Sequence, residues 1–204
     1  MRLWLAVLIG IVVAPVGPAG TYDSKRGYHL TCPDGWRVDS AAQGGVFDVI
    51  IKSATGSQTF GVAMANSLIK DYEEEKGSVE RGRRLALEMQ GYSIESSACR
   101  VATIGARKAI ECDTTAVRSG RSLHEHYVSF NAGSHNYLVW CIAPSSEYDQ
   151  AAGGFNAMLA SFTFDEPDAA VEACGNGLLY LVIGVTLITS IAGVSVWALR
   201  RAKA

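Results

Sequence analysis

The pair His124 and His126 is the pattern in this sequence whose residue types and spacing best suit metal chemistry. The surrounding residues read as a β-strand with period two. On a strand the two imidazoles share one face, whereas Glu125 points to the other. Zinc binds imidazole nitrogen at ~2.0 Å, but two ligands are too few, and neither His29 nor His135 is spaced to supply a third. We therefore expect a polar, solvent-facing strand surface, with a metal site at His124 and His126 as the alternative.

Five cysteines are the other residues that could do chemistry: Cys32, Cys99, Cys112, Cys141 and Cys174. No spacing ties Cys32 to a histidine that could act as its base, so we do not expect a nucleophilic thiol. Thiols that leave the cytosol tend to form disulfides, whereas cytosolic thiols stay reduced. The pairing of these cysteines therefore depends on the compartment, which the two ends of the sequence indicate.

Residues 1–20 have the order of an export signal. Arg2 provides a short basic start, residues 3–14 form an apolar core, and residues 17–19 supply small side chains for cleavage. We expect cleavage after Ala19 or Gly20. An uncleaved N-terminal anchor is the alternative, because the basic flank is a single arginine.

Residues 177–199 are predicted to span a membrane. They are 23 consecutive positions without a charged residue, more than the ~20 apolar residues that cross a bilayer as a helix. Tyr180 and Trp197 lie near the two limits, and a basic tail, residues 200–204, follows at once. Basic tails stay in the cytoplasm, so we expect a single-pass type I membrane protein. The sequence has no Asn-X-Ser/Thr site, which favours a bacterial inner membrane with the domain in the periplasm.

Export favours disulfides within the domain. Residues 99–112 read as a hairpin with its turn at residues 104–107, which places Cys99 opposite Cys112. Opposed side chains have Cβ atoms ~4.5 to 5.5 Å apart, so a bridge there needs little adjustment. Cys32 and Cys141, at the ends of two apolar strands, would form the second pair, although the other pairings of these four stay open. Cys174 is left over, either without a role or in a bridge between neighbouring chains.

Residues 21–166 are expected to form one extracytoplasmic domain, joined to the span by a linker at residues 167–176. All 20 acidic residues of the chain lie in residues 21–176, with only 14 of its 18 basic residues. The balance of about six net negative charges argues against nucleic acid and anionic lipid head groups as partners, because both reward dense lysine and arginine.

The periodicity of the domain predicts an α+β fold with a curved antiparallel sheet flanked by helices. A helix is expected from Ser78, as its cap, to about residue 90, with Val79, Ala86 and Met89 toward the core and Gly91 as the stop. The acidic run before it and the basic residues 81–84 are expected to face solvent. A second helix should begin at residue 145 or 146, weakened by the glycines at 153 and 154. The predicted strands are residues 28–31, 36–38, 46–52, 59–65, 92–103, 108–117, 122–131, 136–142 and 162–164.

Two short motifs resemble those of a known superfamily. The stretch GYHLTCPDGWRV, residues 27–38, is similar to the opening of PsbP and Mog1-like domains, and FNAMLASFTF, residues 155–164, is similar to their closing motif. The sequence departs from the pattern where Cys32 replaces the usual tyrosine. The resemblance implies an α/β/α sandwich that serves in binding and is mostly not catalytic. It also implies that a turn at residues 33–35 folds Trp36 back into the core and leaves Cys32 at the strand end as a staple.

We therefore expect a non-enzymatic binding or accessory module, held at the membrane, that engages a protein partner and needs no cofactor. The sequence contains no nucleophile elbow, phosphate loop or metalloprotease helix. One alternative is an exported domain that binds a metal or small molecule at His124 and His126, with or without hydrolytic activity. The other is a processed surface protein, in which the region around Cys174, the apolar span and the basic tail form a sorting signal.

Overall fold

The computed structural model of the chain describes residues 20–39 and 47–165. Several predictions lie outside these residues: the signal peptide up to residue 19, the linker at residues 167–176 with Cys174, the span at residues 177–199 and the basic tail at residues 200–204. Within the described residues, no helix is both long enough and apolar enough to cross a membrane.

The secondary structure of the described residues follows the predicted order, with one additional strand at the start. The elements are β1 (Gly20–Asp23), β2 (Tyr28–Cys32), β3 (Trp36–Val38), β4 (Val49–Ser53), β5 (Thr59–Ala65), α1 (Tyr72–Glu88), β6 (Ser93–Ile104), β7 (Arg107–Arg118), β8 (Arg121–Ala132), β9 (His135–Pro144), the 3-10 helix η2 (Ser145–Glu147), α2 (Tyr148–Ala160) and β10 (Thr163–Phe164). Strand β1 was not predicted, because the sequence pattern assigned its first residue to the export signal.

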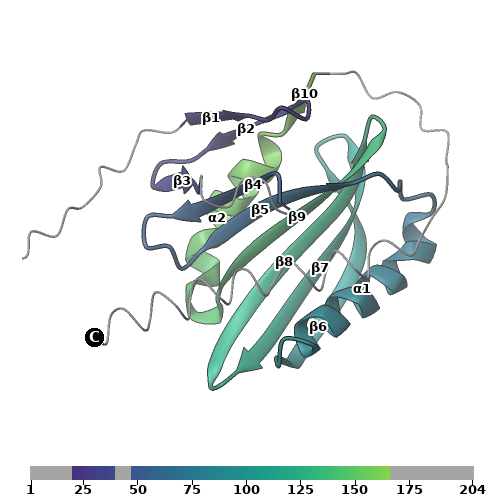
Figure 1. Ribbon diagram of the computed structural model, residues 1–204. Coiled ribbons are helices and arrows are strands. Elements are labelled where there is room, and N and C mark those ends of the chain that lie inside the picture. Colours follow the sequence, from purple (N-terminus) through teal and green to yellow (C-terminus); the bar gives the residue numbers. More distant parts are fainter. Residues whose placement is uncertain (1–19, 40–46, 166–204) are drawn as a thin grey trace, which may run out of the picture.

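The strands form two antiparallel sheets rather than the single sheet expected from the sequence (Figure 1). The larger sheet has the order β3-β4-β5-β9-β8-β7-β6, and the smaller one has the order β1-β2-β10. Strand β10 pairs with β2 and so joins the two ends of the domain. The predicted hairpin register is confirmed, since Thr103 pairs with Lys108 and Cys99 pairs with Cys112.

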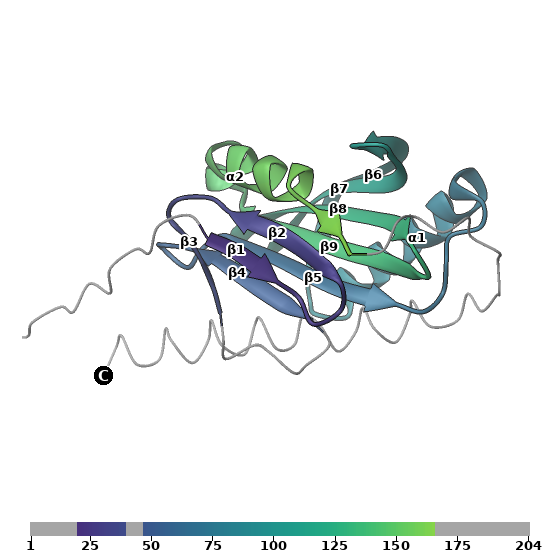
Figure 2. The same ribbon diagram turned by 90° about the horizontal axis from the view of Figure 1, so that it is seen from above.

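The seven-stranded sheet separates two hydrophobic cores. One core lies between this sheet, helix α2 and the smaller sheet, and it includes Tyr28, Val139 and Phe155. The other core lies on the opposite face, under α1, and it includes Leu87 and Trp140. Adjacent residues of β9 point into different cores because side chains alternate along a strand. The layers are visible in Figure 2, where α2 and β2 cover the larger sheet from one side.

Helix α1 begins seven residues earlier than the sequence indicated. Its cap is Asp71, not Ser78, and the Asp71 carboxylate accepts hydrogen bonds from the backbone N–H groups of Glu73 (2.9 Å) and Glu74 (3.1 Å). The acidic run is thus the first helical turn, where negative charge is favourable next to the positive end of the helix dipole. The prediction that this run is only a solvated face therefore misses its role in the first turn of the helix.

The end of α1 agrees with the prediction only in part. Gly91 has a φ of +79°, the left-handed conformation expected just beyond a helix. Ala86 is buried as predicted, but Met89 is 59% exposed and Leu87 takes the core position instead. Because the helix starts earlier and ends at Glu88, Met89 lies beyond its last turn and leaves the apolar face.

Helix α2 contains a glycine because Trp36 packs directly against its backbone. Gly35 has a φ of +82°, and the Trp36 N–H donates to the Pro33 carbonyl at 3.1 Å, which confirms the predicted turn. The Trp36 ring lies 5.3 Å from the ring of Phe155 in the core. A Cβ atom on Gly154 would lie only 2.7 Å from Trp36 Nε1. The absence of a side chain at residue 154 therefore creates the space for the indole.

Candidate functional site

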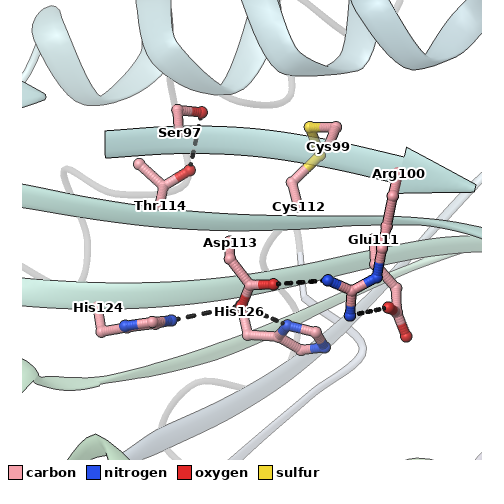
Figure 3. A network of polar contacts seen from close by, with 9 residues as sticks. All are labelled: Ser97, Cys99, Arg100, Glu111, Cys112, Asp113, Thr114, His124 and His126. Atoms are coloured by element: carbon pink, nitrogen blue, oxygen red, sulfur yellow. Dashed lines mark hydrogen bonds and ion pairs between the residues drawn. A yellow bond between two sulfur atoms is a disulfide. The ribbon is translucent and has the colours of Figure 1, made fainter. Parts of the chain in front are cut away.

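Asp113 of β7 lies between two histidines of β8 on the sheet face that carries α2 (Figure 3). His126 Nδ1 is 2.9 Å and His124 Nε2 is 3.4 Å from the same oxygen, Asp113 Oδ1. The strand register produces this geometry, because His126 pairs directly with Asp113 and His124 lies two residues further along. The expectation that the two imidazoles share a face, opposite Glu125, is confirmed.

Arg100 of the edge strand β6 completes this group. Its Nη2 donates a hydrogen bond to Glu111 Oε2 at 2.6 Å, and its Nη1 lies 3.6 Å from Asp113 Oδ2. The Arg100 side chain is 66% exposed, whereas that of Glu111 is 11% exposed. The guanidinium thus presents a cation to solvent above two carboxylates. We call the following residues the polar cluster: Arg100, Glu111, Asp113, His124 and His126.

Hydrogen bonding from the histidines stabilises the charged form of Asp113. The hydrogen bond from His124 and then that from His126 hold the pKa of the Asp113 carboxyl well below its usual range, although partial burial acts in the opposite direction. Each imidazole can donate one N–H to the carboxylate while uncharged. The carboxylate therefore fixes the orientation of both rings.

Tyr148, the first residue of α2, marks the border between the polar cluster and the core. Its ring stacks on the His124 ring with centroids 3.6 Å apart and an interplanar angle of 17°. Burial, followed by the negative charge of Asp113, raises the pKa of the Tyr148 hydroxyl. The hydroxyl stays protonated, and one face of the His124 ring is covered by the helix.

A metal site at His124 and His126 lacks a third ligand in the described part of the chain. Both rings direct a nitrogen at the same Asp113 oxygen, and no group of three or more His, Cys, Asp or Glu residues in residues 20–39 and 47–165 could hold a metal ion. The other two histidines belong to different places in the fold. His29 lies in the smaller sheet, and His135 lies at the start of β9.

One predicted disulfide is present and the other is not. Cys99 and Cys112 are bonded, with Cα atoms 4.0 Å apart. Cys32 and Cys141 are free and buried, so the predicted Cys32–Cys141 bridge is wrong. Cys32 belongs to the smaller sheet and Cys141 to the larger one. Facing sheets pack ~10 Å apart, whereas a disulfide requires Cα atoms within ~7 Å. Burial raises the pKa of both thiols, which makes them poor nucleophiles.

The predicted solvent exposure of the basic residues 81–84 is wrong for Arg83. Arg83 was expected to face solvent, but it is buried and pairs with Glu125 on the face of the sheet that carries α1. The spacing of Arg83 from Ala86 and Leu87, three and four residues along the helix, is the signal that could have placed it on the buried face.

No model of a known protein family matches the sequence, and no curated protein matches it. Solved structures do match. Cyanobacterial PsbP (CyanoP) from Synechocystis sp. PCC 6803 has a TM-score of 0.55 and 12% identity over 74% of this chain and 95% of that chain.

Two further matches have lower TM-scores. The Ran-binding protein Mog1p of Saccharomyces cerevisiae has a TM-score of 0.47 and 9% identity over 72% of this chain and 96% of that one. LpqN, a protein involved in cell envelope biogenesis of Mycobacterium tuberculosis, has a TM-score of 0.43 and 14% identity over 74% and 87% of the two chains. The described domain is an α+β sandwich of two antiparallel sheets and the two helices α1 and α2. Its fold is similar to that of cyanobacterial PsbP, as the sequence resemblance implies.

Proposed function

We propose that this chain is a non-enzymatic accessory module, anchored in a membrane, that binds a protein partner outside the cytoplasm through the polar cluster. The observation that carries the proposal is the arrangement around Asp113. Three strands bring five polar side chains together on one sheet face, and Arg100 at the outer strand is 66% exposed. Side chains held in fixed orientations by one another form a preorganised binding surface, because little conformational freedom remains to be lost on binding.

The chemistry of the polar cluster favours binding over catalysis. A general base works best with a pKa near the operating pH, whereas the pKa of Asp113 is held well below its usual range. The ring nitrogens that face Asp113 are engaged in orienting the two histidines. The Asp113 carboxylate and the two ring nitrogens that face it therefore shape the surface.

The extracytoplasmic location is supported by the disulfide between Cys99 and Cys112, since disulfides persist mainly in oxidising compartments. The predicted export signal and the predicted span at residues 177–199 lead to the same location. A single span would hold the domain near the membrane surface, where we place the partner as well.

Site-specific photo-crosslinking tests the proposal directly. The full chain carries a photoreactive amino acid at Arg100 in one variant and at Arg84, an exposed position on α1, in a control variant. After illumination of native membranes, we expect one defined protein adduct from position 100 and none from position 84. An adduct from position 84 alone would place the interface on the other face. No adduct from either position would contradict the binding function.

The two alternatives have their own measurements. Stoichiometric zinc in the purified full chain, lost in a variant with His124→Ala and His126→Ala, would replace the proposal with a metal-binding function. The mass of the mature C-terminus distinguishes an anchored protein from a processed surface protein, because an intact end at residues 199–204 excludes processing.

A further inference from the structure

His29 lies between two carboxylates that come from opposite ends of the domain. Its Nδ1 is 2.7 Å from Asp23 Oδ1, and its Nε2 is 2.5 Å from Asp165 Oδ1. Asp23 is the last residue of β1, and Asp165 directly follows β10. Strand β2, which carries His29, pairs with both of these strands. One imidazole therefore joins strand β1 to the residue that directly follows β10.

The two contacts determine the protonation state of the ring. An ionised carboxylate only accepts hydrogen bonds, so each ring nitrogen must carry a proton to donate to its partner. A neutral imidazole has one N–H and would direct the lone pair of its other nitrogen at a carboxylate. Both contacts are satisfied at the same time only in the imidazolium form.

We propose that His29 is a pH-controlled latch that fastens Asp165, at the C-terminal exit of the domain, to the hairpin of β1 and β2. With the ring protonated, both carboxylates are held. After the ring loses its proton, its single N–H is shared between two carboxylates, so each contact is made only part of the time and the hold on Asp165 weakens. This inference concerns the chain exit and does not depend on the binding function of the polar cluster.

The charged groups around the His29 ring are the two carboxylates and two cations of the neighbouring turn. Asp165 and Asp23 are the groups that raise the pKa of His29, first through their hydrogen bonds. Two cations lie in the turn between β1 and β2. Arg26 is directed to Asp48, with its Nε 3.3 Å from Asp48 Oδ1, and Lys25 is exposed. Thr163, which pairs with His29 from β10, carries no charge.

The latch acts on a short stretch of chain. Strand β10 has only two residues, and the Phe164 ring is held in the core, 5.0 Å from the ring of Tyr137. Beyond Phe164, two described contacts hold residue 165. Its backbone N–H donates a hydrogen bond to the Gly27 carbonyl at 3.0 Å, and its carboxylate contacts His29. Release of the carboxylate thus leaves a single backbone hydrogen bond at the exit.

The sign of the pH dependence follows from the raised pKa of His29. The ordinary value for histidine is 6.5. The latch is fully closed below this value and opens as the pH rises through the higher pKa of the folded protein. A rise in pH above the ordinary histidine range therefore loosens the contact of Asp165, and acidification restores it.

Histidine NMR and hydrogen exchange on the purified full chain test the latch. We expect the His29 resonance to titrate above the ordinary histidine value, and the amide of residue 165 to be better protected at about pH 6 than at about pH 9 after correction for intrinsic exchange rates. In His29→Gln, which cannot be protonated, the protection should be low at both pH values. In His135→Gln, a control at a different site, the pH-dependent protection should persist.

Two results would overturn the proposal. One is a His29 resonance that titrates at or below the ordinary value. The other is equal protection of residue 165 at both pH values in the wild-type chain. Asp165→Asn provides a second variant that leaves the ring in place, and it should lower the pKa of His29 and remove the pH dependence. These readouts are independent of partner crosslinking, so either proposal can fail alone.

Discussion

Arg83 of α1 and Glu125 of β8 form a two-pronged ion pair inside the protein. Arg83 Nε lies 3.0 Å from Glu125 Oε1, and Arg83 Nη2 lies 2.5 Å from Glu125 Oε2. Their side chains are 6% and 1% exposed. The guanidinium also lies over the rings of Tyr127 (5.1 Å) and Trp140 (5.6 Å). This ion pair connects α1 to strand β8 and determines the position of the helix on the sheet.

Removal of one member of this pair should be strongly destabilising. Arg83→Met or Glu125→Gln leaves a buried partner without its counterion, which typically lowers the free energy of unfolding by ~3–5 kcal/mol. Chemical denaturation of the purified chain measures the loss, with Arg84→Met, an exposed neighbour, as the matched control. The variant with both changes should recover part of the loss. A loss below about 0.5 kcal/mol in both single variants, typical of a surface site, would contradict the buried pair.

The glycine pair of α2 offers a test with an internal control. Gly154→Ala should destabilise the fold by ~1–3 kcal/mol, because the new methyl group would overlap Trp36. Gly153→Ala meets no atom within 4 Å and should stabilise the helix by ~0.5–1 kcal/mol through higher helix propensity. Thermal unfolding of the two variants compares them directly. Equal effects of the same sign would show that Trp36 does not pack on residue 154.

The polar cluster should contribute to stability in a pH-dependent manner. Because the pKa of Asp113 is lower in the folded state than its ordinary value of 3.8, its charge stabilises the fold above pH 3.8, and this contribution is lost as the pH falls toward the folded-state value. The side chain is 37% exposed, so solvent screening reduces the expected cost of Asp113→Asn near neutral pH to about 1 kcal/mol. Unfolding measured from neutral to acidic pH should show this difference shrinking below pH 3.8. Glu95→Gln, at an exposed position of β6, serves as the comparison, and a pH-independent effect of Asp113→Asn would argue against the charge.

Alkylation followed by peptide mapping distinguishes the observed from the predicted cysteine pairing. Cys32 and Cys141 should resist alkylation in the folded chain because both are buried. In denaturant without reductant both should react, whereas Cys99 and Cys112 should react only after reduction. If Cys32 and Cys141 also required a reductant, the second disulfide would exist after all. The result does not depend on the state of Cys174.

Local chemistry made part of this structure predictable. The turns at residues 105 and 120 have glycines with positive φ, and short turns between alternating strands fix antiparallel neighbours and their register. The pairing of Cys99 with Cys112 follows from that register, and the shared face of His124 and His126 follows from the alternation of side chains along a strand. Such features depend on residues close in sequence, so the amino-acid sequence alone is sufficient to predict them.

Features that depend on distant residues were not predictable in the same way. The pairing of Asp113 with His126 follows from the short turn between β7 and β8, but the rotation of both histidine rings toward one Asp113 oxygen does not. The free state of Cys32 depends on its position in the smaller sheet, whose existence rests on strand β1 and the two-residue strand β10. The early start of α1 at Tyr72 was hidden because acidic residues suit both solvent exposure and a first helical turn.

The bond between Cys99 and Cys112 ties the outermost strand of the larger sheet to its inner neighbour. Strand β6 has twelve residues, and the bond lies near its middle. An edge strand of this length can peel away and change places with the equivalent strand of another molecule, which is one route to domain swapping and aggregation. The disulfide prevents this exchange and leaves the hydrogen bonds along the edge unchanged. Strand exchange through β6 would therefore require a reductant first, so the redox state of Cys99 and Cys112 decides whether this edge can exchange.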